Sequence, residues 1–93
     1  MLERGGTAQP DPEVVATALP NGEVVLLHLG AKSYYSLNQT GSRIWQMSAQ
    51  RRTLGEISDG LQEEFDVTPE VAWQSTVDLV EELADARLVR IVA

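Results

Sequence analysis

The 93-residue sequence contains no cysteine, a single histidine and no long hydrophobic run. Without cysteine the chain has neither a disulfide framework nor thiolate metal ligands, and this composition is typical of a reducing compartment, so we expect a cytoplasmic protein. A transmembrane helix needs about 20 predominantly apolar residues in succession, and no such run occurs. The first residues, MLERGGTAQPDP, have no apolar stretch after their arginine, and we expect no secretory signal there.

Basic residues are scarce as well. The chain has seven Lys and Arg against fourteen Asp and Glu, for a net charge of −7. The segment between Thr53 and Ala86 carries ten acidic residues and no basic one. Such a surface repels phosphate backbones, which argues against nucleic-acid binding. Two interpretations stay open, a solvated helical face and a surface for a basic peptide.

Groups for catalysis are few. His28 lies in an apolar run, which favours a packed residue over a metal ligand or a catalytic base. The pairs Glu63–Glu64 and Glu81–Glu82 are adjacent on predicted helices, so their carboxylates do not converge as an acid/base pair requires. No nucleophile elbow and no phosphate loop occurs. We therefore predict a non-enzymatic protein without cofactor or metal.

The order of elements predicts one domain over residues 13–93, preceded by a flexible tail over residues 1–12, which are rich in Gly, Pro and polar residues. Two β-rich runs flank Pro20-Asn21-Gly22, and Asn-Gly between such runs indicates a hairpin. Gly30-Ala31 forms a second turn into KSYYSL. These three strands form an antiparallel meander, in which the run Val24–Leu29 is central or covered on both faces.

Three helices follow the strands. Asn38 is suited to cap a helix that ends near Gln50. Thr53 and Glu56 fit a capping box for the second helix, and Thr68 followed by Pro69 begins a third that runs to about Ala86. Strands followed by helices indicate an α+β fold, winged helix-turn-helix-like, with a three-stranded antiparallel sheet and three helices. The final LVRIV forms a short strand or an extended tail.

The third helix has two apolar rows at helical spacing. Ala72, Thr76, Leu79 and Leu83 form one row, which we expect to face the core. A second row lies beside it and comprises Trp73, Val77, Val80 and Ala84. Either both rows are core, or the second row is an exposed apolar groove, which is typical of a binding site. The strand Ser33–Leu37 is last in the meander, and an edge strand beside an apolar helix captures extended peptides by strand addition.

Two adjacent tyrosines occupy this strand. Successive side chains of a strand point to opposite faces, so Tyr35 and Leu37 share one face while Tyr34 and Ser36 share the other. One tyrosine ring therefore helps to fill the core and the other lies near the groove or in solvent. Alternation alone leaves open which is which.

The string LPNGEVVLLHLGAKSYYSLNQTGSRIW, followed by two acidic amphipathic helices, resembles the PqqD-like family. These small winged-helix proteins are RiPP recognition elements, which bind leader peptides of ribosomally made, modified peptides. The resemblance extends from Val14 to about Val92 and is most specific over Tyr34–Asn38, Thr40-Gly41 and Ile44-Trp45. It implies a non-catalytic protein whose third strand and third helix bind the leader. The residues it points to are Ser33, Tyr34, Tyr35, Ser36, Leu37, Trp73, Val77, Val80 and Glu81. Asp78 joins this predicted peptide-binding set, because a leader that docks on the acidic third helix is expected to carry Lys or Arg opposite Asp78 or Glu81.

The resemblance is strongest to the stand-alone leader-binding protein of lasso-peptide clusters. It implies a precursor peptide and a separate leader peptidase as partners, with no nucleic acid and no membrane. A PQQ-pathway peptide chaperone that serves a radical enzyme is the alternative. A winged-helix DNA-binding regulator has the same architecture, but its recognition helix requires basic residues, which the third helix lacks before Arg87.

Overall fold

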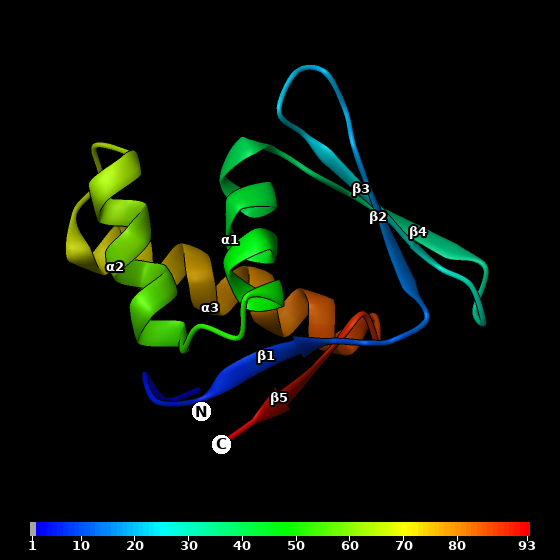
Figure 1. Ribbon diagram of the computed structural model, residues 1–93. Coiled ribbons are helices and arrows are strands. Elements are labelled where there is room, and N and C mark those ends of the chain that lie inside the picture. Colours follow the sequence, from blue (N-terminus) through cyan, green and yellow to red (C-terminus); the bar gives the residue numbers. More distant parts are fainter. Residues whose placement is uncertain (1) are drawn as a thin grey trace.

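The computed structural model describes residues 2–93 and contains two small sheets and three helices (Figure 1). The strands are β1 (Thr7–Pro10), β2 (Val14–Ala18), β3 (Val24–His28), β4 (Ser33–Leu37) and β5 (Val89–Val92). The helices are α1 (Gln39–Ala49), α2 (Leu54–Glu64) and α3 (Pro69–Asp85). The α+β class, the three-stranded antiparallel sheet and the three helices agree with the sequence analysis.

The three-stranded sheet has the order β2-β3-β4, with both neighbouring pairs antiparallel. The hairpin between β2 and β3 closes through the Gly22 N–H, which donates to the Leu19 carbonyl at 3.1 Å. Gly22 has a φ of 86°, a left-handed conformation that favours glycine. The Asn-Gly hairpin and the central place of β3 are therefore confirmed. β4 lies at one edge of this sheet and β2 at the other.

A second sheet was not expected. β1 pairs antiparallel with β5, so that Thr7 faces Val92 and Pro10 faces Val89. Ala8 of β1 is 1% exposed and belongs to the core. The placement of residues 1–12 in a flexible tail is thus corrected over Thr7–Pro10, and the C-terminal run forms a strand. Figure 1 shows this two-stranded ribbon below the helices, with the two termini close together.

Each helix begins at the residue that its sequence predicts. The Asn38 side chain accepts a hydrogen bond from the Gly41 N–H at 2.8 Å and begins α1. Thr53 and Glu56 form the predicted capping box at the start of α2, and Thr68 caps α3. Each cap satisfies backbone donors that have no partner in the first turn. No helix in the described part of the chain is long and apolar enough to span a bilayer.

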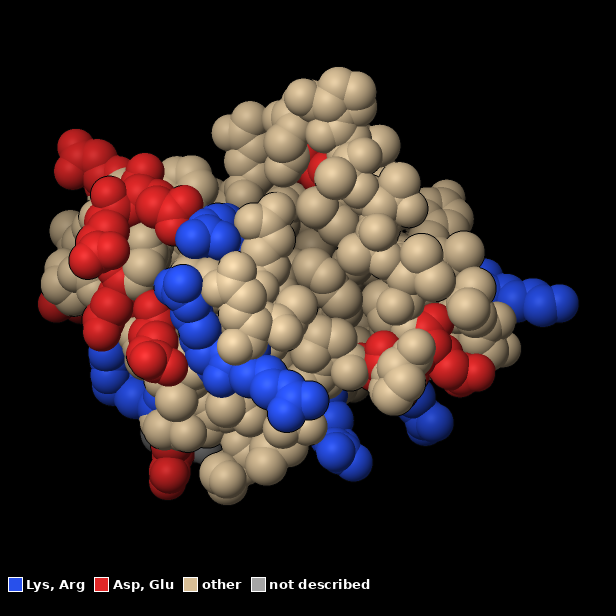
Figure 2. Space-filling view, in the orientation of Figure 1, with Lys and Arg blue, Asp and Glu red and all other residues tan. Residues whose placement is uncertain are grey.

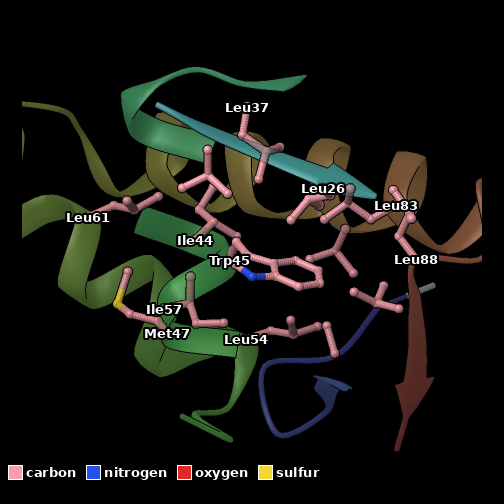
Figure 3. Close-up of a cluster of buried hydrophobic side chains, with 14 of the residues drawn as sticks. Leu26, Leu37, Ile44, Trp45, Met47, Leu54, Ile57, Leu61, Leu83 and Leu88 are labelled. Carbon is pink, nitrogen blue, oxygen red and sulfur yellow. The ribbon is translucent and has the colours of Figure 1, made fainter. Parts of the chain in front are cut away.

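The core lies between the inner face of the three-stranded sheet and the helices (Figure 3). The sheet contributes Leu26 and Leu37, which are at most 3% exposed. Trp45 of α1 lies among the labelled core side chains and is 6% exposed, and Leu83 of α3 is 1% exposed and lies near Leu26 and Leu88 (Figure 3). Because α1 follows β4 after a single residue, the core fixes both the edge strand and the helices beside it.

Candidate functional site

The exposed edge of β4 is the first component of the site. No strand pairs with its outer side in the described part of the chain, since the sheet ends there. Tyr34 points outward and is 74% exposed, whereas Tyr35 is half-buried and packs against the core. Leu37 shares the inner face with Tyr35 and is buried. The structure thus decides which tyrosine faces the core. Ser33 and Ser36 are exposed.

Tyr35 links this strand to α3. Its hydroxyl donates a hydrogen bond to the Glu82 carboxylate. That bond raises the pKa of the Tyr35 phenol above its ordinary value, and burial and the negative charge of Glu82 act in the same direction. The contact joins residues 47 positions apart and links the inner face of β4 to α3.

A cleft of about 380 Å³ opens beside this contact, between the start of α1 and the outer flank of α3. None of its lining residues belongs to β4 itself, and we call it the β4–α3 cleft because Glu82, which lines it, accepts the hydrogen bond from Tyr35 of β4. Its walls consist of Asn38, Thr40, Gly41 and Ile44 on one side, and of Ser75, Asp78, Leu79 and Glu82 on the other.

Gly41 allows the two walls to approach each other. A Cβ atom at this position would lie 3.2 Å from Asn38 Oδ1 and 3.4 Å from Leu79 Cδ2. The distance to Asn38 Oδ1 is tight, whereas the distance to Leu79 is at the lower limit of ordinary van der Waals contact. A side chain larger than a methyl group at this position would have to find room between Asn38 and Leu79, which both line the cleft. Gly41, which belongs to the most specific part of the resemblance, thus has a packing role next to the site.

Most of the α3 residues predicted for the site lie elsewhere. Val80 is fully buried in the core, so it offers no surface to a peptide. Trp73 lies beneath Arg4, whose guanidinium carbon is 5.5 Å from the centre of the indole ring. At about 100° per residue, Val77 falls on the Trp73 flank of the helix and Glu81 points away from the core. Of the predicted α3 residues, only Asp78 lines the cleft.

The residues that sequence reasoning missed are Ser75, Leu79 and Glu82. Leu79 was assigned to the core row but is only half-buried, while Val80 of the other row takes the core position. The helical periodicity correctly indicated a wide apolar face, but it divided the two rows at the wrong place, because Val80 and not Leu79 is buried with Ala72, Thr76 and Leu83. It did not reveal which flank of α3 faces β4, because that depends on how the helix crosses the sheet. The polar residues beside Leu79 at helical spacing, Ser75 and Glu82, were the available signal.

The cleft is acidic. Asp78 and Glu82 line it, and no basic residue does. The Asp78 carboxylate accepts a hydrogen bond from Gln74 Nε2 at 2.7 Å, which orients it along the helix surface. Opposite charges across an interface raise association rates and fix register more than they raise affinity. A ligand with Lys or Arg near this end of the cleft is therefore complementary to it.

One group of potential metal ligands occurs in the described residues, formed by Asp11, Glu13 and His28 within 4.8 Å of one another. His28 Nδ1 accepts a hydrogen bond from the Ala31 N–H at 3.1 Å. A neutral imidazole that accepts at Nδ1 carries its proton on Nε2, which faces Asp11 Oδ1 at 3.8 Å. His28 is 8% exposed and acts as a packed residue.

Comparison with known proteins places these features in a family. The family model for coenzyme PQQ synthesis protein D (PqqD) matches residues 23–89, and no match was found among curated proteins. The chain is similar to the solved structure of TbiB1 in complex with the TbiA(beta) leader peptide, with 30% identity and a TM-score of 0.83. The similarity covers 88% of this chain and 94% of that one.

A second solved structure has the same fold. It is a lasso peptide synthetase B1 complexed with the leader peptide, with 22% identity and a TM-score of 0.79. The match covers 92% of this chain and 98% of the other. The family model covers well over half of the chain, and the fold agrees over almost its whole length. The chain therefore belongs to the PqqD family, as a PqqD-like RiPP recognition element.

Proposed function

We propose that this protein is a non-catalytic cytoplasmic adaptor that binds the leader segment of a ribosomally made precursor peptide. The leader adds as a strand to the free edge of β4 and places side chains in the β4–α3 cleft. The adaptor then presents the precursor to a maturation enzyme, the leader peptidase of lasso-peptide biosynthesis. In this proposal the three helices and the β-hairpin form a winged helix-turn-helix-like scaffold that binds the peptide.

A single observation carries the proposal: an unpaired strand edge lies next to a cleft of side-chain size. Strand addition uses the free N–H and C=O groups of β4 for register, and the cleft beside α3 adds specificity for side chains. The relative at 30% identity is described as a complex with a leader peptide, which supports the same type of ligand. The proposed site comprises Ser33–Leu37 together with Ser75, Asp78, Leu79 and Glu82.

Two other functions are weaker candidates. A PQQ-pathway chaperone for a radical enzyme is favoured by the family model, and it requires the same cleft with a different precursor. A DNA-binding regulator requires basic residues on its recognition helix, whereas α3 presents Asp78, Glu81 and Glu82 to solvent. A salt-steep affinity for random duplex DNA, without leader binding, would favour the regulator.

The test uses two neighbouring glutamates of α3. Glu82 lines the cleft and holds Tyr35, whereas Glu81 is exposed on another flank. Fluorescence anisotropy with the labelled leader of the precursor encoded beside this protein measures the dissociation constants. We expect Glu82→Lys to weaken binding at least tenfold and Glu81→Lys to change it less than twofold.

The pair is matched because both variants change the net charge equally. A general electrostatic effect would move both dissociation constants together and would contradict a specific cleft. Binding of a lasso leader without binding of a PQQ-type precursor would assign the protein to the lasso-peptide pathway, and the reverse result would assign it to the PQQ pathway. Absence of binding to either leader would overturn the proposal.

A further inference from the structure

The opposite edge of the three-stranded sheet is also free. β2 pairs with β3 on one side only, and no strand pairs with its outer side in residues 2–93. Ala16 and Ala18 point to the inner face of the sheet, because they pair with the buried Leu26 and Val24. Both alanines are nevertheless exposed. The helices therefore leave this strip of the inner sheet face uncovered.

A groove lies along this strip, between β2 and α1. Its floor is apolar and is formed by Ala16, Ala18, Trp45 and Ala49, in a hollow of about 460 Å³. A second hollow of about 550 Å³ continues from Ala49 toward the β1–β5 ribbon and is lined by Arg51 and Arg90. We call the two hollows together the β2–α1 groove. It is separate from the β4–α3 cleft, and the two share no lining residue.

The charge at the far end of this groove is unusual for the molecule. The protein has a net charge of −7, yet two guanidinium groups line this hollow against one carboxylate, Asp11. Asp11 is engaged locally, because it accepts the Glu13 N–H at 2.8 Å and faces His28. None of the ion pairs among residues 2–93 includes Arg51 or Arg90. Figure 2 shows a band of basic side chains between a cluster of acidic side chains and a hollowed, uncharged surface.

We propose that the β2–α1 groove binds an extended acidic segment of a protein partner other than the leader peptide. The segment pairs with the free edge of β2 over about five residues, which is the length of this strand. Alternate residues of the segment carry small or medium apolar side chains, which pack on the floor of the groove over Ala16 and Ala18. Asp or Glu residues that follow them pair with the Arg51 and Arg90 guanidiniums, which suit carboxylates as bidentate donors.

The charge of the groove selects this occupant. A leader suited to the acidic β4–α3 cleft is basic there, whereas the β2–α1 groove favours the opposite charge. A segment rich in Lys or Arg meets the two guanidiniums and is repelled. Binding at one edge of the sheet also leaves the other edge free. The two ligands are therefore bound side by side on one adaptor.

In the experiment, peptides that bind the free protein are selected from a displayed library of random 12-residue peptides. Enriched peptides are synthesised, and their affinities are measured by anisotropy for the wild type and for four variants. Ala16→Arg blocks the groove, and Thr17→Arg places the same side chain on the outer face of the same strand as the matched control. Arg90→Glu reverses the charge of the far end. Glu82→Lys alters the other cleft.

We expect a class of peptides that alternates apolar residues and contains at least two Asp or Glu. These peptides lose at least tenfold in affinity with Ala16→Arg and with Arg90→Glu, and less than twofold with Thr17→Arg and Glu82→Lys. Peptides sensitive to Glu82→Lys alone belong to the β4–α3 cleft and bear on the proposed function instead. The two proposals therefore fail separately.

Three results would overturn the inference. The first is that no enriched peptide is sensitive to Ala16→Arg. The second is that peptides sensitive to Ala16→Arg bind the Arg90→Glu variant as tightly as the wild type, which would mean that only the apolar part of the groove binds them. The third is a wild-type dimer, measured by light scattering, that Ala16→Arg but not Thr17→Arg converts to monomer. The groove would then bind a second copy of the chain. Circular dichroism of every variant verifies the fold.

Discussion

Val80 provides a direct test of how α3 is oriented. Its side chain is fully buried, although it belongs to the second apolar row of α3, for which the sequence left open a role as a peptide groove. Val80→Ala removes two methyl groups from the core, which costs about 1.6 kcal/mol at about 0.8 kcal/mol per group. An unrelaxed cavity of roughly 40 Å³ adds about 1 kcal/mol at ~24 cal/mol per Å³. We therefore expect a loss of about 2–3 kcal/mol in the free energy of unfolding.

A loss of this size is easily measured in a domain of 93 residues. It lowers the melting temperature by roughly 10–20 °C, at about 4–8 °C per kcal/mol for a domain of this size. Urea denaturation, followed by the fluorescence of the buried Trp45, gives the change in stability. Glu81→Ala, at the neighbouring exposed position, serves as the control and changes stability by less than about 0.5 kcal/mol.

The same variant separates a core residue from a binding residue. We expect Val80→Ala to leave the affinity for the leader peptide within twofold of the wild type at a temperature where it is fully folded. Ser75→Arg is expected to do the reverse: it preserves stability and abolishes binding, because Ser75 lines the β4–α3 cleft. A folded Val80→Ala protein that binds the leader more weakly than Ser75→Arg does would refute the assignment of the cleft.

Two further predictions concern the contacts that hold the two sheets in place. The pKa of the Tyr35 phenol is raised in the folded state, so the folded protein keeps this proton to a higher pH than the unfolded chain does. The stability that this difference contributes is therefore fully present below pH ~10, and it is lost as the pH rises from there toward the folded pKa. Urea denaturation between pH 8 and 11 should therefore show a steeper loss for the wild type than for Tyr35→Phe, and equal slopes would contradict the Tyr35–Glu82 contact. Removal of residues 1–10 deletes β1 and exposes the core around Ala8. We expect the free energy of unfolding to fall by roughly 2 kcal/mol or more, which lowers the melting temperature by at least about 8 °C. Ala8→Asp should reproduce the loss and Gln9→Asp should not, whereas an unchanged melting temperature after truncation would restore the tail interpretation.

The helices were predictable because their signals are local. Asn38, Thr53 and Thr68 each bond to a backbone group three residues later, so a short window of sequence contains the whole interaction. The hairpin at Asn21-Gly22 is local in the same way, because only a positive φ at Gly22 closes that turn. Propensity and local hydrogen bonds were therefore sufficient to place α1, α2, α3 and the β2–β4 meander.

The β1–β5 ribbon shows the opposite case. Thr7 and Val92 pair across nearly the whole chain, and no pattern within TAQP indicates a partner at the far end. Short strands with a proline and polar residues resemble loops in composition. Their pairing is decided by the helices, which bring the two termini to the same side of the core.

The sequence by itself determined the order of the β2–β4 meander and the three helices, the starts of those helices, the acidic character of α3 and the family string around Tyr34–Trp45. It also required Tyr34 and Tyr35 to face opposite sides. Only the tertiary structure decided that Tyr35 faces inward, that Leu79 rather than Trp73 borders the cleft, and that β2 has an uncovered inner face. The physical reason is that periodicity gives the angle between rows of side chains on one element. The direction of those rows depends on how the elements cross, which is a property of the packed core.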